Sequence, residues 1–387
     1  KKLKAVVVSG RNVVPVKEKK LYRDLYDEVF KVMVESDALK KYHEIGTPIN
    51  VLTLNSIKGL PTRNLKSAEF EGAERISGEY LAENFLGRRV ACAHCPIACI
   101  HLAALREPYE DEPYFYKTTW VSYDYELTYA LGSMLGISDT HGFLMLLDEV
   151  EKQGVDAMST GVCLAWATEA YEKGLLSRGD LEGLEPKWGD YETYIKMVEL
   201  IVEQPNEFYK HLAMGVEAAA SRYGGLDFAL AFGGNEMPGY HTGPAGHVGY
   251  LTGARHSHLD SGGYSLDEKT IGATPSPEEI ANKLFEEESW RQILSSLVVC
   301  FFARRVYSPE TVAKALKAVG LEKDEGELAE LGREILFEKY RFKVREGFSF
   351  DKLRIPRRIL ETPTPHGMLS EEVIREAVAH YASKIKL

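Results

Sequence analysis

Three cysteines lie within eight positions of the chain, and their spacing is the strongest chemical signal in the sequence. Cys92, Cys95 and Cys99 follow the pattern C-x2-C-x3-C, and two more cysteines stand at Cys163 and Cys300. A [4Fe–4S] cluster takes four cysteine thiolates, and one tight loop can present three of them. The pattern therefore favours such a cluster on the three clustered cysteines and one distant cysteine, either Cys163 or Cys300.

Two other interpretations of the same thiols remain open. Zinc is bound tetrahedrally by cysteine and histidine, so His94 or His101 could complete a site with the three cysteines. The third possibility is that the thiols bind no metal.

The apolar run near the N-terminus, before Ser9–Gly10, is too short for a secretion signal. We therefore expect a cytoplasmic protein, in which such thiols favour metal or redox chemistry over disulfide bonds.

The composition is that of a soluble globular protein. The chain has 387 residues, of which 44% are hydrophobic and 27% charged, a size that predicts two or more domains. Its net charge of −11 argues against nucleic acid or an anionic membrane as the main partner. No run of 18 or more apolar residues is present, so we expect no transmembrane helix.

Hydrophobic spacing predicts helices along most of the chain. Periodic apolar residues predict helices over 140–152, ending at Gly154, and over 208–222. Proline-containing caps at Ser276 and Ser308 mark two further helix starts. Only Lys4–Ser9 has the sequence pattern of a β-strand, and a single strand needs other strands to pair with, which must come from elsewhere. The glycine-rich segment Gly233–Gly263 is too long for an ordinary connection, so we expect it to line a site.

Short motifs in the same order resemble the tungsten-containing aldehyde ferredoxin oxidoreductase family. Pro61–Thr62–Arg63–Asn64 and Gly78–Glu79 precede the cysteines, and Ala130–Leu131–Gly132–Ser133 follows them. Near the end, Phe342–Lys343–Val344–Arg345–Glu346–Gly347–Phe348 and Pro356–Arg357–Arg358 match as well. The resemblance runs from about residue 1 to residue 380.

This resemblance implies a set of cofactors and partners. Ser296–Leu297–Val298–Val299–Cys300 matches the family's Ser-Leu-x-x-Cys segment, which assigns Cys300 as the fourth cluster ligand and leaves Cys163 as a core residue. A tungsten- or molybdenum-bis-molybdopterin would oxidise a small aldehyde to a carboxylate. The [4Fe–4S] cluster would pass the electrons to ferredoxin. A homodimer is implied as well.

Two residues are implied to act on the substrate. Glu126 matches the family's active-site glutamate and would be a general base. Its alternative role is that of an ordinary carboxylate at a helix N-terminus. His258 matches a histidine near the metal, and His256 could replace it in a register shifted by two. One of these histidines would be catalytic or would orient the substrate.

Two segments resemble the family's pterin-binding motif. The residues implied to bind the pterins are Glu151, Val155 and Asp156 in the first segment and Ser295 and Val299 in the second. The second segment lacks the motif's aspartate and glycine. Asp260 stands where a basic residue usually meets the cofactor, and an anion facing the phosphate-bearing pterin would be unfavourable. These departures weaken the expectation of a second bound pterin.

We expect a mainly α fold with two multi-helical domains. Residues 1–10 would end a β-rich, pterin-binding N-terminal domain that is absent from this chain. Residues 11–200 would carry the cluster loop and the first pterin segment, and residues 201–387 the glycine-rich loop and the fourth cluster ligand. The cofactor would lie between them. The competing functions are a non-catalytic electron-transfer or assembly subunit that keeps only the cluster, and a zinc-stabilised helical interaction protein.

Overall fold

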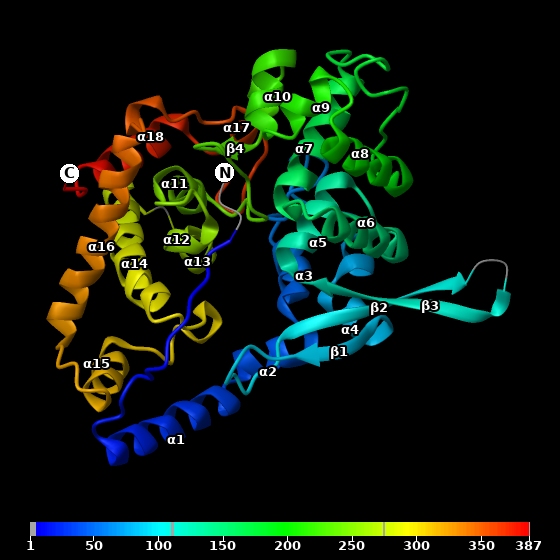
Figure 1. Cartoon of the computed structure of the whole chain (residues 1–387). Helices are drawn as coiled ribbons and strands as arrows, with labels where there is room; N and C mark the ends of the chain where they lie inside the picture. Colours follow the sequence, from blue (N-terminus) through cyan, green and yellow to red (C-terminus); the bar gives the residue numbers. More distant parts are fainter. Residues whose placement is uncertain (1–4, 110–111, 274, 387) are drawn as a thin grey trace.

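The fold is mainly helical, as the sequence predicts. A computed structural model describes residues 5–109, 112–273 and 275–386, and in these residues it contains 18 α-helices and two small antiparallel sheets (Figure 1). One large hydrophobic cluster contains residues from both sides of position 200, among them Leu147 and Leu251. The division into domains at that position stays a proposal.

The elements of the first half include the two strands on either side of the cysteine loop, residues 91–99. They are α1 (Lys19–Glu35), α2 (Asp37–Ile45), α3 (Asn50–Ser56), α4 (Gly78–Asn84), β1 (Leu86–Val90), β2 (Ile100–Tyr109), β3 (Glu112–Tyr123), α5 (Tyr125–Leu131), α6 (Thr140–Gln153), α7 (Ala157–Glu172) and α8 (Tyr191–Glu203). The cysteine loop connects β1 to β2, so two paired strands fix both of its ends.

The elements of the second half include those of the glycine-rich segment, β5, α11 and α12. They are α9 (Glu207–Leu212), α10 (Val216–Tyr223), β4 (Ala231–Phe232), β5 (Asn235–Glu236), α11 (Pro244–Thr252), α12 (His258–Ser261), α13 (Gly263–Lys269), α14 (Pro277–Ser296), α15 (Pro309–Ala318), α16 (Glu325–Arg345), α17 (Arg358–Glu361) and α18 (Glu371–Ala382). Helix α14 packs against α16 and α18, and these helices gather at one side of the molecule (Figure 1).

The strand prediction was wrong in two respects. Lys4 lies outside the described residues, and residues 5–10 form no strand; Val7 is 90% exposed. The strands lie instead at β1–β2–β3, where β2 and β3 form a long hairpin that projects from the helical body (Figure 1). His101, Ala103 and Leu105 are buried at alternate positions of β2, which is the two-residue period of a strand with one face on the core.

Most predicted helix boundaries are confirmed. Helix α6 ends at Gly154, which adopts the left-handed conformation at φ 68°. Helices α14 and α15 begin after Ser276 and Ser308, whose side chains cap them. The predicted helix 208–222 is broken, because Gly215 has φ 106° and the chain turns there between α9 and α10.

Among the described residues, no single helix is long and apolar enough to cross a bilayer. Two helical segments, Tyr125–Leu135 and Thr140–Gln153, are long and apolar enough only when they are counted together, and the chain bends by 116° between them.

Close packing of α5 on α7 holds the helix that carries Glu126. Gly161 of α7 faces the backbone of Ala130 on α5, and a Cβ atom on Gly161 would lie 2.2 Å from the Ala130 carbonyl oxygen. Backbone atoms cannot move aside as a flexible side chain can. The glycine therefore sets how closely the two helices approach.

Gly161→Ala should lower the free energy of unfolding by about 1–3 kcal/mol, because overpacking forces α5 and α7 apart. Urea denaturation followed by far-UV circular dichroism measures this. The control is Gly326→Ala in the first turn of α16, where the nearest heavy atom is a side-chain oxygen of Asp324 at 3.3 Å and no backbone atom is close, and where alanine favours the helix. Equal stability of the two variants would contradict the close-packing account.

Candidate functional site

The cysteine loop has a backbone shape that is unusual for its residue types. His94 and Ala98, each directly before a cysteine, adopt left-handed φ values of 60° and 52°. Val298, two residues before Cys300, does the same at φ 57° and is 91% exposed. Positive φ is unfavourable for a β-branched residue, and strained residues of this kind cluster at functional sites. Both cysteine segments are therefore held in shapes that local preferences do not explain.

A small hydrophobic cluster brings the segment after Cys300 onto the cysteine loop. Its buried members are Met33, Leu39, Ile97 and Ala303, and Cys95, Cys99, Val306 and Tyr307 pack against it. The Phe302 ring lies 4.8 Å from the Tyr42 ring, centroid to centroid. Ala303 and Ile97 lie about 200 residues apart in sequence, so tertiary packing places the fourth predicted ligand at the loop.

The four predicted cluster ligands are near enough to affect one another electrostatically. Burial, followed by the neighbouring thiols of Cys300, Cys95 and Cys92, raises the pKa of Cys99 to about 11. A thiol whose thiolate form is disfavoured by burial and by three neighbouring thiols is suited to a group that supplies positive charge, because metal-bound thiols lose their protons. The residues present therefore fit a four-iron cluster.

One of the two histidines predicted for the zinc alternative, His101, is engaged elsewhere. Among the described residues, no three histidine, cysteine or acidic side chains converge closely enough to hold one metal ion. His101 Nε2 lies 2.9 Å from the His43 carbonyl, and its Nδ1 lies 3.3 Å from the Tyr123 hydroxyl, so both ring nitrogens are engaged. A four-iron cluster is larger than a single ion, and its ligands need not converge on one point.

Cys163 lies apart from this group. It is buried in α7, where its thiol lies 3.8 Å from the Leu212 carbonyl oxygen. This is the core position that the sequence predicts for it.

A cavity of about 910 Å³ adjoins the cysteine loop. Cys99 lines it, as do both predicted active-site residues, Glu126 and His258. Its walls come from both sides of residue 200, and Tyr240 and His258 belong to the glycine-rich segment that we expected to line a site. A cavity of this size suits a large organic ligand.

Glu126 and His258 lie beside each other in this cavity, with their side chains 16% and 9% exposed. Glu126 lies in the first turn of α5, and Glu126 Oε1 lies 3.1 Å from His258 Nε2. Its other oxygen, Oε2, accepts a hydrogen bond from the Gly239 backbone N–H at 3.1 Å. His258 Nδ1 and Glu126 Oε1 are buried and have no hydrogen-bond partner among the described residues. A buried polar atom without a partner is costly, which indicates a position for a ligand.

Burial shifts the titration of both groups towards their neutral forms. It raises the pKa of Glu126 to about 7, although hydrogen bonds from Gly239 and Tyr240 oppose the shift. Burial, with a smaller effect of Arg291, lowers the pKa of His258 to about 4. Near neutral pH the histidine is therefore uncharged, and the glutamate can both hold and release a proton.

His256 and Asp260 do not face the cavity. His256 Nδ1 donates to the Tyr250 carbonyl at 2.9 Å, and Lys343 Nζ lies 3.0 Å from its Nε2. Asp260 is buried and forms an ion pair with Arg255 at 2.7 Å. The expectation that Asp260 would oppose a cofactor phosphate was therefore wrong, because the carboxylate faces the protein and caps α12.

The two predicted pterin segments differ in their positions. Glu151, Val155 and Asp156, at the turn between α6 and α7, line the cavity. Ser295 and Val299 are not among its lining residues; Ser295 is exposed at the end of α14. The first segment fits a large cofactor in the cavity, and the pterin role of Ser295 and Val299 stays a prediction.

Several lining residues were missed by the sequence reasoning. Tyr240 and Tyr264 stack with ring centroids 4.1 Å apart, and the Tyr240 ring lies 5.3 Å from the His258 ring. Arg304 and Arg305 also line the cavity. The sequence feature that could have identified Tyr240 as a lining residue is its position directly after Gly239 in the glycine-rich segment. The position of Arg304 and Arg305 four and five residues after Cys300 could have placed them near the cluster.

Comparison with known proteins matches most of the chain. A family model described as aldehyde ferredoxin oxidoreductase, domains 2 & 3, matches residues 24–383. The tungsten-containing aldehyde ferredoxin oxidoreductase of Thermococcus kodakarensis is 29% identical over 391 residues, covering 97% of this chain and 62% of the relative. The relative from Pyrococcus abyssi has the same identity and coverage. The family resemblance is confirmed, and the chain spans less than two thirds of these relatives' length.

Two further proteins are similar. The aliphatic sulfonate oxidoreductase, WOR-like subunit, of Pyrococcus furiosus is 30% identical over 231 residues, which are 57% of this chain and 34% of the relative. A solved structure of the active site complex BamBC of benzoyl coenzyme A reductase, in complex with 1,5-dienoyl-CoA, has a TM-score of 0.70 at 17% identity. It covers 95% of this chain and 62% of that chain. At this identity the likeness concerns the fold.

Glu126→Gln should change how stability depends on pH. The folded-state pKa of Glu126 is raised from 4.5 to about 7, so its favourable contribution is complete below pH 4.5 and is lost as the pH rises through 7. Relative to the wild type, the variant should gain up to about 3 kcal/mol of unfolding free energy between pH 4 and pH 8. Urea titrations at several pH values measure this. A difference that does not change with pH would contradict the burial of an ionisable Glu126.

Proposed function

The chain belongs to the aldehyde ferredoxin oxidoreductase family, and from this premise we propose that it is the helical part of an enzyme that oxidises aldehydes to carboxylates. It would carry a [4Fe–4S] cluster on Cys92, Cys95, Cys99 and Cys300. One observation carries the proposal: the buried pair of Glu126 and His258 and the cluster ligand Cys99 line one cavity. Chemistry and electron removal would then take place side by side.

A tungsten- or molybdenum-bis-molybdopterin, when bound, supplies the two-electron chemistry that protein side chains lack. Glu151, Val155 and Asp156 are the residues that would hold it from the α6–α7 turn. Because the chain spans 62% of its relatives' length, we propose that an N-terminal pterin-binding domain completes the site.

Glu126 would accept and release protons during the reaction. Conversion of an aldehyde and water to a carboxylate releases two electrons and three protons, and Glu126 Oε1 is placed to accept a proton. Once protonated, its O–H can donate to His258 Nε2, 3.1 Å away. The neutral imidazole then carries its own proton on Nδ1, the atom without a partner. That N–H would donate to the oxygen of the aldehyde or of the product carboxylate.

Electrons would leave through the cluster towards the surface. Cys92 and Cys300 are exposed, whereas Cys99 reaches the cavity. A cluster held by these residues would connect the buried chemistry to a soluble carrier, which the family resemblance suggests is ferredoxin. We also propose a cytoplasmic location. One relative, the WOR-like subunit of the Pyrococcus furiosus aliphatic sulfonate oxidoreductase, supports association with other chains, and a homodimer stays a proposal.

A second function is a non-catalytic electron-transfer or assembly subunit. Ser295 is exposed and is not among the lining residues of the cavity, which favours this alternative because a second pterin would lack its predicted contacts. Metal analysis distinguishes the two functions. Tungsten or molybdenum together with iron supports the enzyme, whereas iron alone supports the electron-transfer subunit.

Cys300→Ser should reduce the iron content of anaerobically purified protein and bleach its visible absorption, because the cluster loses a thiolate ligand. Cys163→Ser is the matched control and should keep both, since Cys163 lies in the core of α7. A complete cluster in Cys300→Ser would show that another group is the fourth ligand.

Glu126→Gln should lower kcat for aldehyde oxidation by about 10²–10⁴-fold, the usual contribution of a general base, and should leave the iron content unchanged. The wild-type rate should rise with pH through about 7 as Glu126 becomes ionised, and the variant should lose this dependence. Glu372→Gln, on the exposed side of α18, is the control. Unchanged turnover by Glu126→Gln would remove Glu126 from the mechanism.

A further inference from the structure

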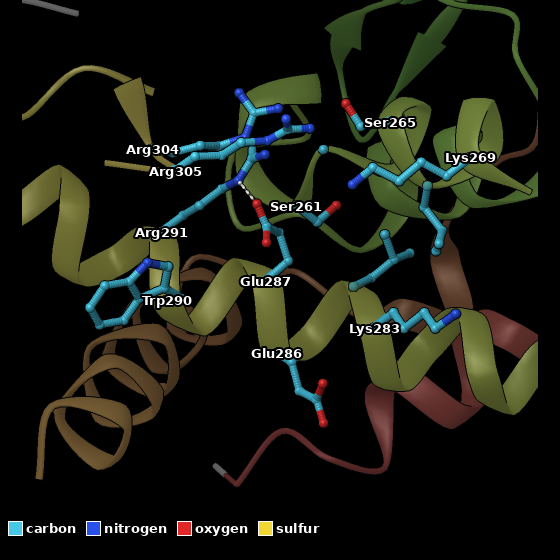
Figure 2. A pocket seen from close by; sticks show the side chains of 13 residues that line it. Ser261, Ser265, Lys269, Lys283, Glu286, Glu287, Trp290, Arg291, Arg304 and Arg305 are labelled. Carbon is cyan, nitrogen blue, oxygen red and sulfur yellow. Dashed lines mark hydrogen bonds and ion pairs between the residues drawn. The ribbon is translucent and has the colours of Figure 1, made fainter. Parts of the chain in front are cut away.

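Arg291 is a buried arginine that has no role in the proposed chemistry. It lies in α14, its side chain is 4% exposed, and its Nε lies 2.8 Å from a carboxylate oxygen of Glu287, one turn earlier. Figure 2 shows this ion pair. A charged side chain is rarely buried to this extent unless its partners hold it there. The other contacts of the guanidinium therefore indicate what the residue does.

One of these contacts reaches the helix that carries His258. Arg291 Nη1 donates a hydrogen bond of 2.9 Å to the carbonyl oxygen of Leu259, the residue directly after His258. Helix α12 has only four residues, so all of its carbonyl groups belong to a last turn, where intrahelical partners are missing. A hydrogen bond from a buried guanidinium therefore helps to fix the position of the His258 ring in the main cavity.

A second contact reaches the segment that carries Cys300. The guanidinium carbon of Arg291 lies over the ring of Phe301, 5.3 Å from the ring centroid, and Phe301 directly follows Cys300. A guanidinium in this position is attracted by the negative face of the ring. One side chain is therefore in contact with the neighbours of both His258 and Cys300.

The backbone leaves room for this arginine at Gly262. Gly262 connects α12 to α13 at a left-handed φ of 63°, and a Cβ atom on it would lie 2.3 Å from Arg291 Nη2. A side chain at this position would therefore displace the guanidinium, and the backbone angle would also strain it. Gly272 has a similar φ of 84° but no atom within 4 Å of its Cβ position. It therefore offers a control for the backbone strain alone.

The charge of Arg291 is permanent, because arginine stays protonated in proteins. After burial, it is the largest cause that lowers the pKa of His258. Glu287 offsets part of the charge, but the Glu287 side chain is 41% exposed, so water screens its effect. A fixed cation favours the reduced form of an iron–sulfur cluster, because reduction adds negative charge and the local charge tunes the potential.

We propose that Arg291 is a positioning residue, which holds His258 and Cys300 at a fixed spacing and places a permanent positive charge beside the cluster. The inference rests on the proposed function. Arg291 is not among the lining residues of the main cavity, so it acts through Leu259 and Phe301. The group that handles protons and the segment that carries electrons away would thus be held by one side chain.

Redox titration of the anaerobically purified holoprotein tests the charge without turnover, with the electron paramagnetic resonance of the reduced cluster as the signal. The midpoint potential should fall in Arg291→Gln, which loses the cation, and should stay close to that of the wild type in Arg291→Lys, which keeps it. Lys283→Gln is the matched control. It removes the same charge from the same helix, where the side chain points away from Arg291 (Figure 2), and should leave the potential unchanged.

Gly262→Ala tests the position of the guanidinium while its charge is kept. The new methyl group should push the guanidinium away from Leu259 and Phe301, so kcat for aldehyde oxidation should fall by about 10–100-fold with little change in KM. Gly272→Ala carries the same kind of backbone strain without this displacement and should keep the wild-type kcat. Because Gly262→Ala retains the arginine, it decides the question if Arg291→Gln does not fold.

Three results would overturn the inference. They are an unchanged potential in Arg291→Gln with full iron content, an equal fall of the potential in Arg291→Gln and Arg291→Lys, and equal kcat in Gly262→Ala and Gly272→Ala. Turnover by the wild type tests the proposed function separately. If the wild type oxidises no aldehyde but the potential follows the charge at position 291, the cation beside the cluster stands and the oxidase proposal fails.

Discussion

The architecture of the site depends on one tertiary contact, the packing of the segment after Cys300 on the cysteine loop. Two stretches with left-handed, non-glycine residues, His94 and Ala98 in one and Val298 in the other, meet there through Ile97 and Ala303. Each such residue costs on the order of 1 kcal/mol or more, so the loop would relax without this packing. The same contact forms one wall of the main cavity, since Cys99 and Phe302 both line it.

Acidic and basic side chains enter the main cavity from different elements of the fold. Acidic groups, Glu126 and Glu151 among them, enter it from α5 and α6, whereas Arg304 and Arg305 enter from the segment after Cys300. Burial keeps Glu126 close to the point where it gains or loses a proton at neutral pH. A carboxylate in this state suits proton transfer, and fixed cations suit binding of charge. The proposed enzyme would use Glu126 for proton transfer.

Sequence reasoning predicted the parts of the site that local patterns encode. The C-x2-C-x3-C spacing identified the loop, and the capped starts of α14 and α15 are encoded by serine and proline. The β2–β3 hairpin was missed because strand preference depends on packing partners that are distant in sequence. The cationic pair Arg304 and Arg305 was missed because a sequence does not tell whether a carboxylate will neutralise a given arginine. The predicted position of the Asp260 carboxylate was wrong for the same reason, because an ion pair with Arg255 holds it away from the cavity.

The proposed enzyme requires that the thiols of Cys92, Cys95, Cys99 and Cys300 surround an iron–sulfur cluster beside the main cavity. Metal analysis of anaerobically purified protein tests it most directly. The account predicts about four irons per chain, accompanied by tungsten or molybdenum when the pterin site is complete. Protein that contains zinc in place of iron, or that contains no iron after anaerobic handling, would contradict it.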